Sequence, residues 1–338
     1  MHTYRLLLTL TTLLALVVVV VGAYVRLSDA GLGCPDWPGC YGRMVVPDEE
    51  HEIAAANELH PQRPLEAGKA WKEMVHRYLA GTLGLLIVIL AVMDWRLRRR
   101  LQGGHLLHLL LVAVVLFQAA LGMWTVTLLV MPAIVTAHLL GGMLTVSLLW
   151  WLTLSRRELS RSTLSMTEGQ GSLRALALLA LLVVAAQIAL GGWTSTNYAA
   201  LVCGDFPTCR GEWWPEMDFS QGFRIWHGTG VNYEYGVLDL AARTAIHVTH
   251  RIGALITLLV VGMVALTALR RGNGPVRRTG GFMLGFLLLQ ISLGIANVIL
   301  GLPIWAAVAH NGVAALLLLS CVTLLRTTTV RPAFRSGF

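Results

Sequence analysis

Long apolar runs separated by short polar segments dominate the chain. Each run has about 20 residues, the length that a helix needs to cross a lipid bilayer. The runs occupy residues 6–25, 74–93, 106–129, 132–154, 175–195, 245–269, 280–300 and 304–325. This pattern predicts an all-α integral membrane protein with eight transmembrane helices. The first run also has features of a secretory signal peptide, but its length and its counterpart in the second half of the chain favour a spanning helix.

Composition and charge support this prediction and give it an orientation. Hydrophobic residues make up 56% of the 338 residues and charged residues 13%, about half the charged share of an ordinary soluble domain. With the N-terminus inside, the inner segments hold 16 of the 26 Lys and Arg residues but 3 of the 18 Asp and Glu residues. Because basic residues in short loops stay cytoplasmic, we expect both termini in the cytoplasm. The net charge of +8 then indicates contact with anionic membrane lipid, and nothing in the chain indicates nucleic acid.

A shift of about 172 residues aligns the chain with itself. The segment "QAALG" (118–122) matches "QISLG" (290–294), and "VVGAYV" (20–25) matches "ALGGWT" (189–194). Each copy contains four spans, so both copies enter the membrane with the same polarity and an axis along the membrane normal relates them. We therefore expect two tandem pseudo-twofold four-helix bundles, at residues 1–154 and 173–338, joined by a cytoplasmic linker at 155–172.

Each copy has one cysteine pair in a long outer loop. Cys34 and Cys40 frame "CPDWPGC", and Cys203 and Cys209 frame "CGDFPTC". The predicted outer face borders an oxidising compartment, which favours the disulfides Cys34–Cys40 and Cys203–Cys209. A zinc site is the alternative, but neither loop offers closer cysteine pairs or histidines at ligand spacing. Loops of this length commonly cover a site.

Four histidines stand apart because they lie inside apolar spans, near the outer ends. His76 and His138 belong to the second and fourth spans of the first half, and His250 and His310 hold the matching positions of the second half. A polar side chain at this depth is a candidate functional residue, although hydrogen bonds between helices are an alternative. Two imidazoles that face each other across a bundle core can hold a haem iron. We therefore expect two haem sites near the outer surface.

The segments "EMVHR" (73–77) and "HVTHR" (247–251) share a His-Arg pair and differ three residues before the histidine. The first half has Glu73 there and the second half has His247. A carboxylate one turn from a haem ligand lies near the edge of the macrocycle. Glu73 would accept a proton from attacking water or stabilise a developing positive charge there. An ion pair with Lys72 or Arg77 is the alternative.

Arg77 and Arg251 follow the first haem-ligand candidate of each half. A guanidinium at the membrane interface would pair with a haem propionate through charge-assisted hydrogen bonds. The alternative is an arginine that only reaches the interface with its charged end. The residues themselves leave this choice open.

These motifs together resemble the heme A synthase family over about residues 20–325. They are the cysteine-framed outer loop, "EMVHR", "TAHLLGG" (136–142), "THR" (249–251) and "AHNG" (309–312). The resemblance implies a multi-pass protein of the bacterial inner membrane, with its haem sites toward the periplasmic face. It also implies oxidation of the C8 methyl group of haem O to a formyl group, by two successive hydroxylations with water-derived oxygen, to make haem A for terminal oxidases.

The resemblance assigns roles to single residues. The first half would bind the substrate haem O and its product haem A through His76 and His138, and the second half would hold haem b through His250 and His310. Glu73 matches the carboxylate that is regarded as catalytic in the family.

Two other functions fit the same histidines. A di-haem b electron-transfer cytochrome would use fixed haems without chemistry on them, and a haem carrier would hold its cargo briefly. The sequence leaves open the electron acceptor, the formation of a homo-oligomer, and whether haem O synthase or cytochrome oxidase assembly factors deliver the substrate.

Overall fold

The computed structural model describes residues 2–97, 105–158, 170–228 and 230–329, and its long elements are helices. Eight of them are long and apolar enough to cross a membrane. They are α1 (His2–Leu27), α3 (Ala67–Leu97), α4 (His105–Thr127), α5 (Pro132–Glu158), α6 (Gln170–Thr196), α8 (Leu240–Arg271), α9 (Gly274–Ile299) and α10 (Ile304–Thr327). Two short helices, α2 (Glu50–Leu59) and α7 (Phe219–Gly222), lie in the long loops. The predicted all-α membrane fold with eight spans is confirmed, while most of the predicted linker, residues 159–169, lies outside the described residues.

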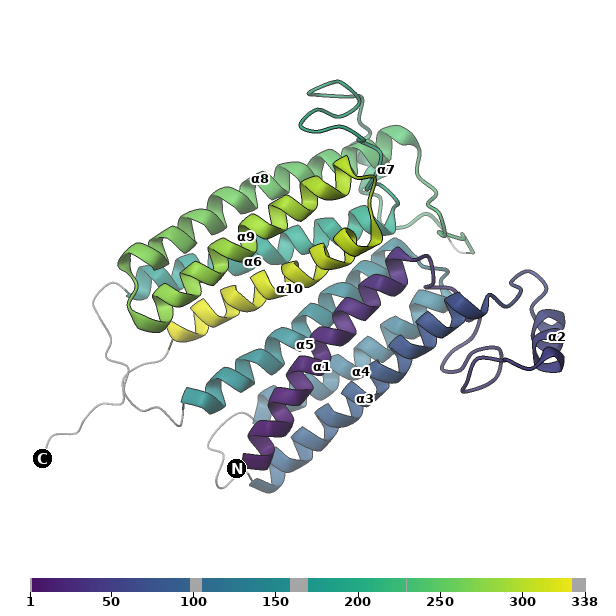
Figure 1. Cartoon of the computed structure of the whole chain (residues 1–338), viewed down its shortest axis with the longest axis horizontal. Helices are drawn as coiled ribbons and strands as arrows, with labels where there is room; N and C mark the ends of the chain where they lie inside the picture. Colours follow the sequence, from purple (N-terminus) through teal and green to yellow (C-terminus); the bar gives the residue numbers. More distant parts are fainter. Residues whose placement is uncertain (1, 98–104, 159–169, 229, 330–338) are drawn as a thin grey trace, which may run out of the picture.

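The spanning helices form two rings of four (Figure 1). In the first half α1 packs against α3, α3 against α4, α4 against α5, and α5 against α1. In the second half α6, α8, α9 and α10 pack in the same cyclic order. In each ring the second and fourth helices therefore face each other diagonally across the core, α3 toward α5 and α8 toward α10. These diagonal helices carry the four candidate haem ligands.

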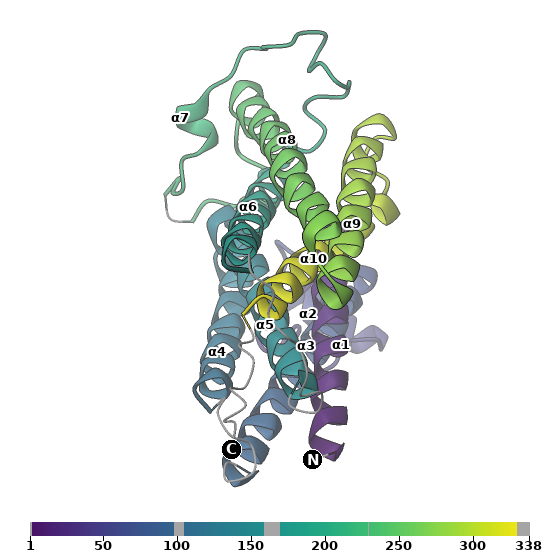
Figure 2. The ribbon, with the colours of Figure 1, turned by 90° about the vertical axis from the view of Figure 1, so that its left-hand side faces the viewer.

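Three helix pairs join the halves, namely α1 with α10, α5 with α6, and α5 with α10 (Figure 2). At the outer end the Arg26 guanidinium donates a hydrogen bond to the Ser195 carbonyl at 2.6 Å. Toward the inner end the indole N–H of Trp150 donates to the Thr323 hydroxyl at 2.8 Å. Matching helices make these contacts on both sides, and the pseudo-twofold relation stays a prediction. The membrane side of each terminus stays a prediction.

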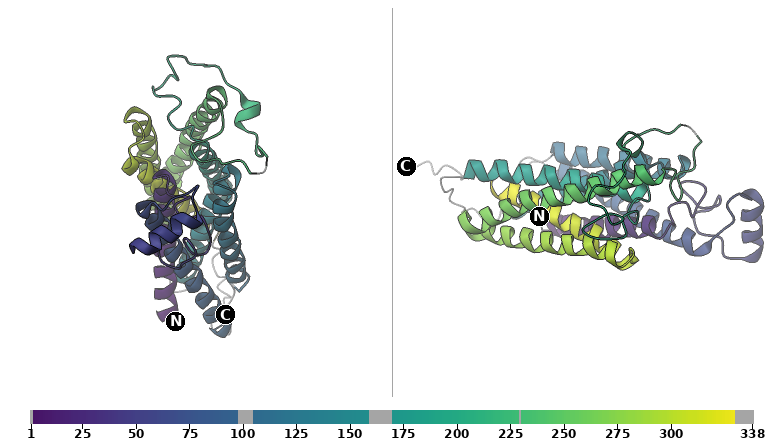
Figure 3. Two further views of the ribbon diagram at one scale, coloured as in Figure 1. Left: turned by 90° about the vertical axis from the view of Figure 1, so that its right-hand side faces the viewer. Right: turned by 90° about the horizontal axis from the view of Figure 1, so that it is seen from above.

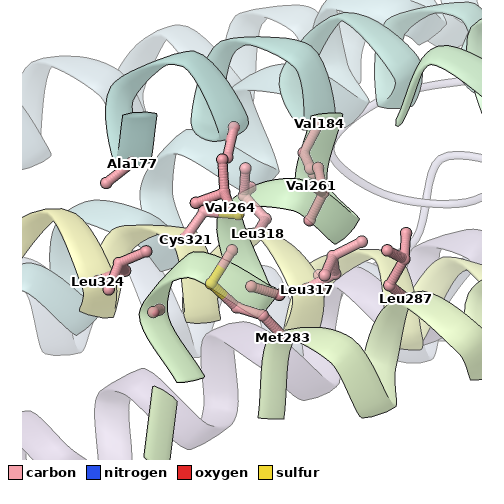
Figure 4. Packing of buried hydrophobic residues seen from close by; sticks show 14 of the residues in the cluster. Ala177, Val184, Val261, Val264, Met283, Leu287, Leu317, Leu318, Cys321 and Leu324 are labelled. Atoms are coloured by element: carbon pink, nitrogen blue, oxygen red, sulfur yellow. The ribbon is translucent and has the colours of Figure 1, made fainter. Parts of the chain in front are cut away.

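Close packing of branched and small side chains fills the core of each ring. Figure 4 shows the second half, where Val261, Val264, Met283 and Leu317 interlock. The free thiol of Cys321 is buried in the same cluster. Lipid is as apolar as these side chains, so helix association here depends on dense van der Waals contact and on internal hydrogen bonds.

The inner ends of the two rings differ in their chemistry. In the first half the carboxylate of Asp94 in α3 is buried, faces Arg156 of α5 at 3.3 Å and contacts both His105 and His108 of α4. The Tyr4 hydroxyl of α1 lies 2.8 Å from Nε2 of His108. All four helices of the first ring thus meet in one polar network, which the pattern of spans did not predict.

The second half replaces this network with small residues. Ala268 and Gly280 hold the positions that match Asp94 and His108. A methyl group added at Gly280 would lie 2.9 Å from both the Ala265 carbonyl oxygen and the Ala268 Cβ. Helices α8 and α9 therefore approach closely at a point where α3 and α4 are held by polar contacts.

The turn between the last two helices of each ring has the same backbone shape in both halves. Leu129 and Val130 between α4 and α5 each have a φ of 53°, in the left-handed region. Gly301 and Leu302 between α9 and α10 have φ values of 70° and 60°. At the first of these two left-handed positions the second half has a glycine, Gly301, and the first half has Leu129.

Both long loops lie at the same end of the molecule, opposite the N-terminal end of α1 (Figure 3). The loop before α3 carries the first cysteine pair and the loop before α8 carries the second. This end of the rings is also where the four candidate haem ligands lie.

Candidate functional site

The two cysteine loops have the same design. Disulfides join Cys34 to Cys40 and Cys203 to Cys209, as predicted. In the first loop the Asp36 carboxylate accepts hydrogen bonds from the backbone N–H groups of residues 41 and 42, at 2.6 and 2.7 Å. In the second loop Asp205 accepts from residues 210 and 211 at 2.5 and 2.9 Å. The zinc alternative is thus not what the described residues form at either cysteine pair.

Asp205 is also bonded by a neighbouring hydroxyl. Hydrogen bonds from the Thr208 hydroxyl and from the Gly211 N–H lower the pKa of Asp205 to about 2. The carboxylate is therefore ionised over the physiological pH range and holds the loop turn closed.

An arginine of the following helix binds each loop through backbone carbonyls. Arg77 of α3 donates to the carbonyls of Asp36, at 2.9 Å, and Gly39. Arg251 of α8 donates to the carbonyls of Asp205 and Thr208, each at 2.8 Å. These contacts give both arginines a role that the sequence did not indicate, which is to fasten the loop over the bundle. Their predicted pairing with haem propionates stays a prediction.

The candidate ligands of the first half face each other across the ring. The ring centroids of His76 in α3 and His138 in α5 lie 6.5 Å apart, with an angle of 86° between the ring planes. Both side chains are partly exposed, yet their Nδ1 atoms are buried without a hydrogen-bond partner. The exposed part of each side chain therefore lies on its other atoms. In the second half His250 and His310 also lie within electrostatic range of each other.

This geometry fits an iron bound between two imidazoles. Bonds from a metal to an imidazole nitrogen are roughly 2 Å long, so two nitrogens that share one metal lie about 4 Å apart. The widths of the two rings account for the rest of the 6.5 Å between the centroids. The buried Nδ1 atoms leave Nε2 as the nitrogen available for a metal. The donor set of two neutral imidazoles is one that haem iron accepts.

A glycine on the neighbouring helix makes room for each of the four rings. In the first half, a methyl group built on Gly22 would lie 2.8 Å from the His76 ring, and one built on Gly122 would lie 3.5 Å from the His138 ring. In the second half, methyl groups on Gly191 and Gly294 would each lie 3.2 Å from a ring, that of His250 and that of His310 respectively. The tightest contact, below 3.0 Å, belongs to Gly22. These four glycines were not identified from the sequence. Their signal was available, because 22 and 191 align in the repeat, as do 122 and 294.

Glu73 lies at the junction of the first ring and its loop. Helix α3 begins at Ala67, so Glu73 lies within it, one turn before His76. The side chain is buried, and its Oε1 accepts from Arg77 at 2.5 Å while its Oε2 accepts from the Cys34 N–H at 2.9 Å. The ion pair with Arg77 that the sequence left as an alternative is present. Lys72 instead lies over the ring of Tyr24.

Gly33 allows the loop to reach this carboxylate. A Cβ at Gly33 would lie 2.6 Å from the carbonyl carbon of Lys69 in α3, closer than atoms of a packed protein approach. Only a residue without a side chain fits here, and its neighbour Cys34 then donates to Glu73. The sequence did not indicate this link between the disulfide loop and the carboxylate.

His247 holds the matching place in the second half but bonds differently. Its imidazole is buried, and its Nδ1 donates a hydrogen bond to the Ala199 carbonyl at 2.7 Å. A backbone carbonyl only accepts, so the proton on this ring is on Nδ1. The second half therefore has a neutral donor to the loop where the first half has an acidic acceptor.

Comparisons with known proteins identify the family of the chain. The model of the cytochrome oxidase assembly protein family COX15-CtaA matches residues 5–322. A heme A synthase of Shewanella oneidensis is 47% identical over 319 residues, which cover 94% of each chain. Heme A synthases of Rhizorhabdus wittichii and Methylobacterium radiotolerans are each 29% identical, over 92% and 96% of this chain and 90% and 88% of their own. The chain resembles these heme A synthases over most of its length. It thus belongs to the COX15-CtaA family of cytochrome oxidase assembly proteins.

Proposed function

We propose that this protein is an enzyme that oxidises the C8 methyl group of haem O to a formyl group and so makes haem A. The observation that carries the proposal is the difference between two matching places. Both halves have the same type of loop, an arginine that binds this loop, and two histidines on facing helices. The buried carboxylate of Glu73 belongs to the first half, and the second half has His247 in its place. A cytochrome or a carrier with two equal haem sites has no use for this difference.

The first half would bind the substrate. His76 and His138 lie on facing helices at a separation that suits one iron between them. The iron of haem O would bind to these two imidazoles, which fixes the macrocycle between α3 and α5. The edge of a macrocycle bound in this way would lie beside the turn of α3 that carries Glu73, one turn before His76, so the carboxylate would be close to that edge.

The reaction requires water, a base and an electron acceptor. The first oxidation joins a water oxygen to the methyl carbon and releases two protons and two electrons. The second oxidation gives a hydrated aldehyde with the same release, and loss of water leaves the formyl group. Four protons and four electrons therefore leave each substrate, so a group that accepts protons must lie next to the carbon.

Glu73 is placed for this role. Each of its oxygens accepts one hydrogen bond, from Arg77 or from the Cys34 N–H, and retains a lone pair for a water proton. Those two donors also hold the carboxylate in one orientation, and a fixed base transfers protons more effectively than a mobile one. Burial excludes bulk water, so its negative charge also stabilises positive charge that develops on the macrocycle edge.

The second half would hold the resident cofactor. His250 and His310 occupy the matching positions on α8 and α10. A haem b bound there would supply one-electron transfer away from the substrate site. We place both haem sites near the periplasmic face of the bacterial inner membrane, because they lie at the end of the rings opposite the segments rich in Lys and Arg.

Extraction of haems tests the proposal directly. The protein is expressed together with a haem O synthase, purified, and its haems are identified by mass. We expect haem A or its alcohol precursor. Haem b alone, at two per chain, would indicate an electron-transfer cytochrome, and mixed haems far below one per chain would indicate a carrier; either result would overturn the proposal.

A further inference from the structure

The four candidate axial ligands differ in the side chain that faces them from the neighbouring helix. Gln187 of α6 has its amide Nε2 at 3.1 Å from Nδ1 of His250, and the same nitrogen donates to the His250 carbonyl at 3.0 Å. The position that matches Gln187 in the first half is Val18 of α1. Nδ1 of His76 is buried there without a hydrogen-bond partner. The first ligand of each half is therefore supported in the second half only.

The backbone of α8 is shaped for the Gln187 amide. A Cβ at Gly253, one turn after His250, would lie 2.2 Å from Oε1 of Gln187. A larger residue at this position would displace the amide. The first half has Leu79 at the position matching Gly253, and Leu79 packs in the same apolar cluster as Val18. A polar pair in the second half thus replaces an apolar pair in the first.

Glutamines also lie beside the other ligand of each half, so His76 is the one candidate ligand with no glutamine at the matching position, although the Nδ1 atoms of His138 and His310 are likewise buried without a hydrogen-bond partner. Gln290 of α9 has its Nε2 at 3.1 Å from Nε2 of His310. Gln118 of α4 packs against Gly141, one turn after His138. Of the four matching positions 18, 118, 187 and 290, position 18 alone has no glutamine. His76 is also the histidine that follows Glu73.

The side-chain oxygen of Gln187, which has no hydrogen-bond partner, is a suitable acceptor for the N–H group of an iron-bound imidazole. Oε1 of Gln187 is buried without a partner. An imidazole that binds iron through Nε2 carries its proton on Nδ1, and this proton needs an acceptor. Rotation of the amide by half a turn exchanges its oxygen and nitrogen, which brings Oε1 to within hydrogen-bond distance of Nδ1. In that orientation Oε1 accepts the imidazole proton, and the amide gives up its hydrogen bond to the His250 carbonyl.

We propose that Gln187 is a positioning residue that makes His250 the tighter and more basic axial ligand, and that Val18 leaves His76 a weaker ligand for a haem that must leave. The inference rests on the proposed function, since it explains how one chain holds one haem and releases another. A hydrogen bond from Nδ1–H fixes the ring and increases electron donation to the iron. The haem of the second half should therefore be retained and should have a lower midpoint potential than it would have without Gln187.

The test uses the full chain with His138→Ala, so that the bis-histidine spectrum reports the second half alone. Gln187→Leu, which keeps the size of the side chain, should weaken haem b binding roughly tenfold or more and raise its midpoint potential. Gln187→Glu supplies a stronger acceptor and should lower the potential below that of the parent. A role in packing alone would not move the potential in opposite directions in these two variants.

The reciprocal change is made in the first half. Val18→Gln with Leu79→Gly, in a chain whose second half is emptied by His310→Ala, should slow haem loss from the first half. In the His138→Ala chain, Gln118→Leu serves as the matched control and should leave the second-half potential unchanged. Unchanged potential and unchanged haem retention in Gln187→Leu would overturn the inference.

The outcome is separable from that of the proposed function. If Gln187→Leu shifts the potential while the unmodified chain yields no haem A beside a haem O synthase, then the proposed function fails and the role of Gln187 stands. If haem A is made and Gln187→Leu has the parent's potential, then the role of Gln187 fails and the proposed function stands.

Discussion

The first and second halves share their framework, and three of their differences have the largest consequences. Both have a disulfide loop that an arginine of the next helix fastens, and both have facing histidines seated against glycines. They differ at positions 73 and 247, at positions 18 and 187, and at the inner end, where Asp94 in the first half matches Ala268 in the second. The shared parts are those that would hold a haem. The differing parts show that a duplicated haem-binding unit can acquire distinct chemistry without a change of fold.

The largest expected effect comes from the carboxylate. Glu73→Gln keeps the side-chain shape but cannot accept a proton, so conversion of haem O should fall by roughly 10²–10⁴-fold. Haem binding should persist, because His76 and His138 are unchanged. The measurement is the haem A fraction after expression with a haem O synthase. His247→Gln is the matched control and should leave conversion within a few-fold; a normal haem A fraction in Glu73→Gln would remove the carboxylate from the mechanism.

The next effect concerns stability at the inner end. Asp94→Asn removes the charge that faces Arg156 and two histidines, and loss of one partner in a buried ionic network costs about 3 kcal/mol or more. The unfolding temperature of the detergent-solubilised protein should therefore fall.

A graft of the second-half residues sharpens this prediction. The fourfold variant Tyr4→Leu, Asp94→Ala, His108→Gly and Arg156→Thr should recover part of the loss, because it leaves no unpaired charge. An unfolding temperature as high as the parent's in Asp94→Asn alone would show that the network has no role in stability.

A smaller effect is expected at the glycines. Gly22→Ala would place a methyl group 2.8 Å from His76, and overpacking of this kind costs about 1–3 kcal/mol. When the histidine is fixed by a bound iron, that cost appears as roughly a tenfold or greater loss of haem affinity in the first half. The ratio of haem to protein after purification measures it.

Gly122→Ala provides the comparison within the same site. Its methyl group would meet His138 at 3.5 Å, an ordinary contact distance, so haem content should stay close to that of the parent. Equal haem loss in both alanine variants would mean that helix flexibility, and not the space for the imidazole, limits binding.

The smallest effect lies in the matching turns. Left-handed backbone costs a residue with a side chain about 1–2 kcal/mol, and glycine loses part of that advantage through the entropy of the unfolded chain. Leu129→Gly should therefore stabilise the protein by about 0.5 kcal/mol. Gly301→Leu should destabilise it by a similar amount. Thermal unfolding of both variants measures this, and a shift of the same sign in both would contradict the strain argument.

The sequence predicted the spans and the disulfides because each depends on residues close together in the chain, and it predicted the repeat because the same short motifs recur in the same order. Apolar run length predicts a spanning helix, and cysteine spacing indicates a short closed loop. The roles of Arg77, Arg251 and Gly33 could not be predicted, because they depend on how near a loop comes to a helix. Similarly, Asp94 could be recognised in the sequence only as an acidic residue near a basic segment. Tyr4 and Arg156 come close to it through the packing of distant helices.

The contact between α1 and α10 has a consequence for how the chain assembles. Of the eight spanning helices described above, α1 is synthesised first, and α10, which it meets across the two halves, is synthesised last. The interface between the halves is thus completed by a contact of long sequence separation, and such contacts form late. A chain that stops before α10 therefore leaves one face of α1 and one face of α5 uncovered.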